Sequence, residues 1–281
     1  MSKLVTFGDG SFGIRSAAKR LCKQAIKSDY FIDPPEHWDL KRIDNVFPEF
    51  LSKNQDFFKT HRKGLGLWLW QPALLIAVLS NSAEGQVICF LDAGCQLSPD
   101  SSAQSTMARY LEFVNRNDFL FTQIRDKSFG IDDLSEVAWT KSECLNQFNL
   151  SLESLESPQI QSGIILVRNC ERVREFAFRW YETCRMMNYQ LLVDSTDKSV
   201  ESPRFISHRY SQSILSLMVK SEGLPRMTDE TYWFPNWSEG LSHPIWSMRN
   251  RSGGDAFRRN IFDLIKIAGA KIERELIARF K

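Results

Sequence analysis

A short run of uninterrupted apolar residues constrains the fold of this chain most strongly. The run Val87-Ile-Cys-Phe-Leu91 shows no polar alternation. Apolar side chains on both faces are typical of a strand in a parallel sheet that helices cover on both sides. The run ends in Asp92-Ala-Gly-Cys95. The sequence therefore predicts a central strand that carries an aspartate at its carboxyl end.

Segments of two kinds alternate along the chain around this run. We expect further strands at residues 3–7, 30–32, 119–124 and 159–167, and helices at residues 17–25, 46–58, 72–79, 98–115, 172–187 and 209–220. Strands that alternate with helices favour an α/β fold in which helices flank a mostly parallel sheet. Residues 191–204 are polar and are predicted to form a mobile insertion. With no internal repeat, we expect one domain over residues 1–254, followed by a helix over residues 255–281.

The composition excludes several classes of function. Lys plus Arg is 36 and Asp plus Glu is 34 in 281 residues, so the chain lacks the basic excess of a dedicated nucleic-acid-binding protein, and no nucleic-acid partner is expected. The six cysteines include no C-x-x-C pair and no secretory signal is recognised, which predicts reduced thiols and a cytoplasmic location. The four histidines are scattered, which disfavours structural zinc. The longest apolar stretch is too short to cross a bilayer.

The candidate ligand site lies at the predicted strand ends, because open α/β sheets bind ligands beyond the carboxyl ends of their strands. Asp92, followed by Ala93 and Gly94, offers a carboxylate in open space that could hold a ribose hydroxyl or a cation on a diphosphate. The alternative is a loop aspartate that caps a turn. The loop Gly8-Asp-Gly-Ser-Phe-Gly13 likewise has two interpretations, a phosphate cradle and a plain turn into a helix.

Several motifs in a fixed order carry a resemblance to a known family. They are Lys63-Gly-Leu-Gly-Leu-Trp-Leu-Trp-Gln-Pro72, Phe90-Leu-Asp-Ala-Gly-Cys95, Trp139-Thr-Lys141, Gln161-Ser-Gly-Ile-Ile-Leu166, His208-Arg-Tyr-Ser-Gln-Ser213 and Pro244-Ile-Trp-Ser-Met-Arg-Asn-Arg251. Over roughly residues 3–251 the chain resembles bacterial glycosyltransferase-like proteins of surface polysaccharide (capsule or O-antigen) synthesis, and it is distantly similar to family 8 glycosyltransferases. The resemblance implies a GT-A fold, a nucleotide-sugar donor with a UDP-sugar favoured, and a saccharide or lipid-linked acceptor.

The resemblance also implies roles for particular residues. Asp92 stands where the family carries its D-x-D motif, with Gly94 in place of the second aspartate, so a divalent cation (Mn²⁺ or Mg²⁺) would rest on Asp92 and His243. Gln212, in a segment similar to the family's D-Q-D-x-L pattern but with Ser211 in place of the first aspartate, is expected with Asp92 to be catalytic. Gln71 replaces an expected lysine. The implied contacts to the nucleotide-sugar are Thr6, Phe7, Gly8, Trp70, Asp92, Gly94, His208, Arg249 and Arg251, and the implied acceptor contacts are Trp68, Gln161, Trp139 and Lys141.

Most of these positions also have a purely structural interpretation. Trp68 and Trp70 would then fill the core, His208 would cap the helix that follows it, and Lys141 and the pair Arg249 and Arg251 would be solvated charges. For a general base, Glu136 and Asp194 are the nearest suggestions. The alternative functions are a non-catalytic protein that binds a nucleotide-sugar or glycan and a scaffolding role in a membrane-bound polysaccharide assembly.

The C-terminal residues 255–281 have the pattern of an amphipathic helix. Apolar residues recur at helical spacing, and basic residues outnumber acidic ones on the other face. Such a helix suits either peripheral contact with the anionic surface of an inner membrane or packing on its own domain.

Overall fold

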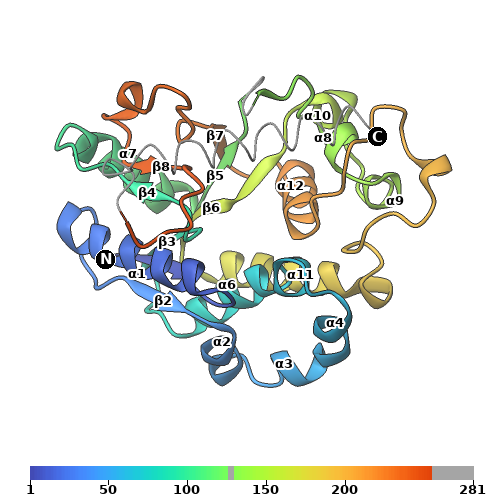
Figure 1. Cartoon of the computed structure of the whole chain (residues 1–281), viewed down its shortest axis with the longest axis horizontal. Helices are drawn as coiled ribbons and strands as arrows, with labels where there is room; N and C mark the ends of the chain where they lie inside the picture. The colour runs from blue at the N-terminus through green and yellow to red at the C-terminus, as the bar shows by residue number, and fades with distance from the viewer. Residues whose placement is uncertain (126–129, 255–281) are drawn as a thin grey trace.

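Six strands form the central sheet in the part of the chain that a computed structural model describes, residues 1–125 and 130–254 (Figure 1). Their order is β2 (Glu36–Trp38), β1 (Ser2–Phe7), β3 (Val87–Leu91), β6 (Ile160–Arg168), β5 (Phe119–Gln123) and β7 (Arg226–Thr228). The pairs β1–β2, β1–β3 and β5–β7 are parallel, whereas β6 is antiparallel to both β3 and β5. The predicted α/β fold with a mixed, mostly parallel sheet is therefore confirmed.

Long helices cover the two faces of the sheet. On one face lie α6 (Trp70–Ser80), α11 (Glu171–Tyr189) and α12 (Ser211–Ser221), and on the other lie α1 (Phe12–Ser28) and α7 (Ala103–Asn117). Figure 1 shows α6 and α11 side by side, as their many contacts require. The side chains of β3 divide between the two layers: Ile88 and Phe90 join the first core, and Val87, Cys89 and Leu91 join the second. The unbroken apolar run is thus explained by burial on both faces.

Short elements connect these layers. They are α2 (Leu40–Val46), α3 (Phe50–Lys53), α4 (Gln55–Thr60), α5 (Gly64–Leu67), α8 (Glu136–Trp139), α9 (Ser142–Leu145), α10 (Leu152–Glu156) and the 3-10 turns Lys198–Val200 and Trp237–Gly240. A second, two-stranded sheet pairs β4 (Gln96–Leu97) with β8 (Ile245–Trp246). This small sheet brings the C-terminal part of the described chain back to the end of β3.

Some predicted elements differ in the structure. The strand expected at 30–32 is wrong: the second strand is Glu36–Trp38, and the backbone of residues 32 and 33 instead donates to the Ser2 carbonyl. The helix expected at 46–58 is replaced by the end of α2, by α3 and by α4. Pro48 explains the first break, because it has no N–H and disfavours helical geometry at Phe47. The segment 191–204 begins with Leu191 and Leu192 fully buried, so its start is anchored in the core.

Two sequence predictions concern membranes. No helix within the described residues combines the length and the apolar character that a bilayer crossing requires. The amphipathic helix predicted for residues 255–281 lies outside the described residues, so membrane contact and the boundary at residue 254 stay predictions.

Candidate functional site

Asp92 follows the last residue of β3 and lies over Gly163 of the neighbouring strand β6. The Asp92 N–H donates to the Gly163 carbonyl at 2.8 Å. The Asp92 Oδ2 atom lies 2.8 Å from the position that a Cβ on residue 163 would occupy. A side chain at residue 163 would therefore push the carboxylate aside, and this is the physical reason for glycine in the Gln161-Ser-Gly163 segment.

The environment of Asp92 opposes its ionisation. Burial raises the pKa of the Asp92 carboxyl from 3.8 to about 6, while the nearby charges of Arg251 and Arg249 act in the opposite direction. The turn that follows Asp92 is closed by the Cys95 N–H, which donates to the Asp92 main-chain carbonyl at 2.8 Å. Backbone atoms close this turn, and the side chain of Asp92 is thus left for another role.

The segment that carries Arg249 and Arg251 is fastened next to Asp92. It follows β8, and the N–H of the buried Asn250 donates to the Gly94 carbonyl at 2.8 Å. A Cβ on Gly94 would come within 3.1 Å of the Arg249 Cα, so the absence of a side chain at residue 94 permits this close approach. Both arginines are exposed. Glycine at residue 94 thus makes room for the backbone segment that carries the two exposed arginines.

Arg20, a buried residue of α1, fixes both segments at once. Its guanidinium donates to the carbonyls of Ala93 (2.8 Å) and Cys95 (2.6 Å) and to those of Asn250 (3.0 Å) and Ser252 (2.7 Å). A planar guanidinium suits this arrangement because its N–H groups point in fixed directions. Arg20 therefore holds the loop that starts with Asp92 against the loop that contains Arg249 and Arg251.

The glycine loop after β1 lies at the same edge of the sheet. The register of β1 with β3 pairs Val5 with Phe90, so residues 7 and 8 reach the level of Asp92. A Cβ on Gly13 would come within 2.7 Å of the Arg251 carbonyl oxygen. The Ser11 side chain caps α1 by accepting from the Ile14 N–H. This loop turns into α1, which begins against the arginine segment. Both interpretations of its glycines, the phosphate cradle and the plain turn, stay predictions.

Gln212 approaches the site from the first turn of α12. Its Oε1 accepts from the Ser162 N–H at 3.3 Å, and its Nε2 donates to the Gln159 Oε1 at 2.9 Å. Ser162 precedes Gly163, the residue over which Asp92 lies, so Gln212 and Asp92 contact neighbouring residues of β6. Tyr210, two residues before Gln212, has the unusual φ of 55°. Backbone strain of this kind costs on the order of 1–3 kcal/mol and is frequent at functional sites.

Other residues that the resemblance implied lie in the core. Phe7 stacks on Trp70 with ring centroids 3.8 Å apart, and both are buried. Thr6 is fully buried, and the half-buried Trp68 stacks on Tyr210 at 5.8 Å. These contacts favour core packing over direct ligand contact for Thr6, Phe7 and Trp70, and they leave Trp68 partly accessible.

His208 and Lys141 hold the chain after α11. The His208 ring lies 3.0 Å from the Leu191 carbonyl through Nε2 and receives the Lys141 N–H at Nδ1. Burial, and then the charge of Lys141, lowers the pKa of His208 to about 3, so the ring is neutral at physiological pH. The Lys141 ammonium donates to the Gln190 carbonyl and lies 3.2 Å from Glu143. In this arrangement neither side chain offers its charge to a phosphate or to an acceptor.

The two remaining acceptor candidates are Gln161 in β6 and Trp139 at the end of α8. Gln161 is buried, and its Nε2 is 3.4 Å from the Thr231 Oγ1. Trp139 donates to the Asp133 carbonyl at 2.7 Å, and the Arg209 guanidinium lies 3.8 Å from the centre of its ring. Both are anchored by neighbours within the fold.

The suggested general bases have different surroundings. Glu136 is completely buried and pairs with Lys220 at 2.8 Å, so the suggestion of Glu136 as a base for an incoming hydroxyl is wrong. Asp194 is exposed and accepts from the Tyr210 hydroxyl at 3.1 Å. It stays a candidate.

The donor atoms at this edge do not fit a cation held by the protein alone. His243 lies 3.6 Å from Glu230 and packs on the Trp233 ring at 4.7 Å. Across residues 1–125 and 130–254, His, Cys, Asp and Glu side chains form no group of three or more that could bind a metal ion. Asp92 and His243 thus lack the third protein ligand of a built site.

Sequence reasoning missed the buried acid Asp229, directly after β7. Its Oδ1 accepts from the N–H and the hydroxyl of Thr231 at 2.8 and 2.5 Å. Burial raises the pKa of Asp229, against the effects of Thr231, Arg125 and Gln161. A carboxylate after a strand was the available signal, but β7 is only three residues long and exposed, so it shows no apolar run.

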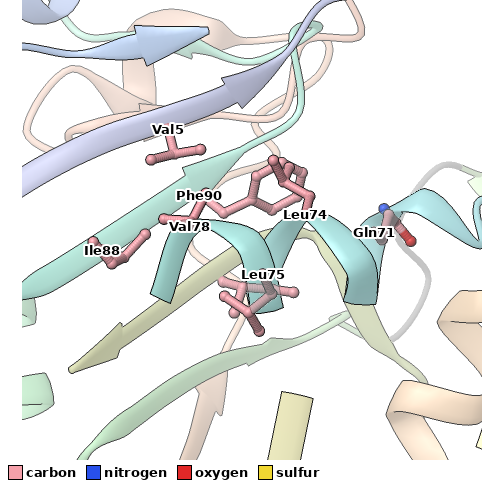
Figure 2. Close-up of a pocket in the computed structure, with 8 residues that line it drawn as sticks. Val5, Gln71, Leu74, Leu75, Val78, Ile88 and Phe90 are labelled. Atoms are coloured by element: carbon pink, nitrogen blue, oxygen red, sulfur yellow. The ribbon is translucent and has the colours of Figure 1, made fainter. Parts of the chain in front are cut away.

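Two hollows within residues 1–125 and 130–254 lie away from Asp92, which lines neither of them. A cavity of about 10 Å³ lies between β1, β3, β6 and α6, and it is lined by Val5, Gln71, Leu74, Leu75, Val78, Ile88, Phe90 and Ile165. Figure 2 shows these residues, with Gln71 at one end. This volume is close to that of one water molecule, and the walls are almost entirely apolar, so the cavity is a packing defect of the core. An open polar groove of about 390 Å³ lies between α9 and residues 195–201.

Comparisons with known proteins give remote similarities. No family model matches the chain, and no curated protein matches it. The solved apo structure of mouse xyloside xylosyltransferase 1 is similar, with 10% identity and a TM-score of 0.44 over 92% of this chain and 100% of that one. A glycosyltransferase involved in the glycosylation of the major capsid of PBCV-1 has 10% identity and a TM-score of 0.41 over 90% of this chain and 94% of that one. Both similarities are too remote to assign a function, which has to be inferred from the residues of the site.

Proposed function

We propose that the chain is a glycosyltransferase of the GT-A type that moves a sugar from a nucleoside diphosphate-sugar, in particular a UDP-sugar, to a saccharide or lipid-linked acceptor. The observation that carries the proposal is the group formed by Asp92, Arg249 and Arg251. A carboxylate and two arginines are fastened at the carboxyl end of the central strand by one buried guanidinium, Arg20. That edge is where α/β folds bind nucleotides.

The two arginines suit the leaving group of such a reaction. When the bond between the anomeric carbon and the diphosphate breaks, negative charge grows on the diphosphate oxygens. Exposed guanidinium groups can bind these oxygens in pairs, and charges that are already positioned stabilise the transition state without further reorganisation. Arg249 and Arg251 are therefore assigned to the diphosphate. Because glycine occupies residue 94, where the D-x-D motif has its second aspartate, the two arginines supply the positive charge that neutralises the diphosphate.

Asp92 and Gln212 suit the sugar side of the reaction. The Asp92 carboxylate accepts hydrogen bonds from hydroxyls of the ribose or of the transferred sugar, which orients the nucleotide-sugar. Gln212 lies on the other side of Ser162 and Gly163, at the start of α12. Its carboxamide is assigned to the transferred sugar, whose ring gains positive charge as the bond breaks. Positioning and charge stabilisation supply most of the catalysis in this scheme.

A nucleotide-sugar-binding protein without transferase activity is the second candidate. Ser211 and Gly94 replace two aspartates of the family pattern, and His208 and Lys141 are buried and neutralised or paired. Such a protein would keep the binding edge and lose the turnover. A role in surface polysaccharide synthesis at the cytoplasmic face of a membrane belongs to the same proposal and depends on the lipid-linked acceptor.

One experiment separates the candidates. UDP-glucose, UDP-galactose, their GDP counterparts and free UDP are screened by thermal shift, with and without Mn²⁺, because a ligand that binds the folded state raises the melting temperature. The released nucleoside diphosphate is then measured over hours without acceptor. Stabilisation with slow release supports the transferase, stabilisation without release supports the binding protein, and no stabilisation by any of these compounds contradicts both.

A further inference from the structure

Gln159 lies between the candidate catalytic residue Gln212 and a buried ion pair. Its Oε1 accepts from the Gln212 Nε2 at 2.9 Å. Its Nε2 lies 2.8 Å from the Thr140 Oγ1 and 3.2 Å from the Glu136 Oε2. Gln159 itself is 1% exposed. Hydrogen bonds thus connect Gln212 through Gln159 to Thr140 and Glu136 in the interior.

The ion pair sets the direction of this chain of hydrogen bonds. Glu136 pairs with Lys220 at 2.8 Å, with both side chains fully buried. Its Oε2 also receives the Thr140 hydroxyl at 2.9 Å. An ionised carboxylate can only accept, and the Trp139 carbonyl, 3.1 Å from the same Gln159 nitrogen, can only accept as well. The amide nitrogen of Gln159 therefore has to face Glu136 and Trp139. The amide oxygen of Gln159 then has to face Gln212, and it accepts from nitrogen there.

The same logic fixes Gln212. Its nitrogen faces the Gln159 oxygen, and its oxygen faces the Ser162 N–H. A carboxamide has two N–H groups and two oxygen lone pairs, so one of each is used and one of each is left for a ligand. A flipped Gln212 would place oxygen against oxygen at Gln159 and nitrogen against the N–H of Ser162. The orientation seen is the one in which both contacts are satisfied.

We infer that Gln159, oriented by Glu136 and the Trp139 carbonyl, is a positioning residue that locks the Gln212 carboxamide in a single orientation at the site. The consequence for turnover rests on the proposed function, whereas the orientation itself does not. Because Gln159 is buried, it acts through Gln212 and touches no substrate. The inference also gives the Glu136–Lys220 pair a role: its carboxylate accepts from the Gln159 amide, which apolar residues of equal volume could not do.

The orientation is tested directly by NMR of the glutamine side-chain amides. Gln159→Met removes the amide at nearly constant volume. Asn54→Leu is the matched control, because Asn54 is a buried amide with hydrogen bonds from both ends to Phe50, Tyr181 and Tyr189 in another part of the core. We expect the Gln212 amide resonances to shift or to broaden by exchange in Gln159→Met and to stay unchanged in Asn54→Leu. Unchanged Gln212 resonances in both variants would overturn the inference.

A second variant and a kinetic cycle complete the test. Should Gln159→Met fail to fold, Thr140→Val removes the hydroxyl between Gln159 and Glu136, and the same resonances are followed. With UDP-glucose and UDP-galactose as probes, Gln159→Met should lower kcat for UDP release about tenfold at nearly constant KM. The double variant Gln159→Met, Gln212→Ala should have the same kcat as the single variant Gln212→Ala. Additive losses would contradict action through Gln212. A wild-type protein that releases no UDP contradicts the proposed transferase, and the NMR result still decides the orientation.

Discussion

Replacement of Asp92 by asparagine should stabilise the protein at neutral pH. Asparagine keeps the shape of the side chain and removes the charge that burial disfavours at this position. A carboxylate that capped its own turn would behave in the opposite way, because its removal would leave backbone N–H groups without an acceptor. The sign of the stability change therefore separates a functional carboxylate from a structural one.

The size of the effect follows from the raised pKa of Asp92. A rise from 3.8 to about 6 corresponds to on the order of 3 kcal/mol at about 1.4 kcal/mol per pKa unit. The carboxyl is only half-buried, so solvent screens part of this cost, and we expect about 1–2 kcal/mol. Between pH 4 and pH 6 the folded protein binds more protons at Asp92 than the unfolded chain does, so this group makes the wild type less stable as the pH rises through that window.

The assay is urea denaturation of the wild type and of Asp92→Asn at five pH values from 4 to 8. The two proteins should have nearly equal free energies of unfolding at pH 4, and the variant should gain its full advantage above pH 7. A variant that is less stable at pH 8, or a difference that does not change with pH, would refute the reasoning about Asp92.

Three further variants test the supports of the site. Arg20→Lys keeps the charge but loses the fork that reaches four carbonyls, and it should cost about 2–4 kcal/mol of unfolding free energy in a urea titration; a loss under 1 kcal/mol would show that the loops hold without the clamp. Gly163→Ala should leave the melting temperature almost unchanged, because only the end of the flexible Asp92 side chain has to move. It should weaken UDP binding about tenfold by calorimetry, and an equal affinity would show that Asp92 does not bind the nucleotide. Glu136→Gln should lower the free energy of unfolding by about 3–5 kcal/mol, because it leaves the buried Lys220 charge without its ionic partner. The double variant with Lys220→Met should recover most of that loss, and a double variant as unstable as the single one would contradict the pairing.

The layers of the fold were largely predictable from the sequence. The apolar run 87–91 marks β3 because both of its faces are buried, and the helical spacing in residues 172–187 marks α11. The second strand was misplaced because β2 has only three residues and carries Glu36, which pairs with Lys3 at 2.9 Å. Local apolar pattern cannot find a strand whose place is set by an ion pair and by hydrogen bonds to a distant strand.

The candidate site was predictable in part. Asp92 and Gln212 each follow a local rule, a strand end and a helix start, and they contact neighbouring residues of β6. Arg20 and Gln159 follow no such rule. The partners of Arg20 are 73 to 232 residues away, and Gln212, the partner of Gln159, is 53 residues away in another element. His208 showed the reverse problem. A histidine before a helix has the same sequence signal whether it is exposed or buried, and only the packing around it shows that it is neutral.

The central claim is that Asp92 and the two arginines form a site for a nucleoside diphosphate. Isothermal titration calorimetry with UDP, at two salt concentrations without divalent cation, tests it most directly, with the double variant Arg249→Gln, Arg251→Gln beside the wild type. The account predicts that the wild type binds UDP, that added salt weakens this binding, and that the double variant loses at least about tenfold in affinity, or about 1.4 kcal/mol. Equal affinity in the two proteins, or no heat from UDP, GDP or their sugar derivatives with the wild type, would contradict it.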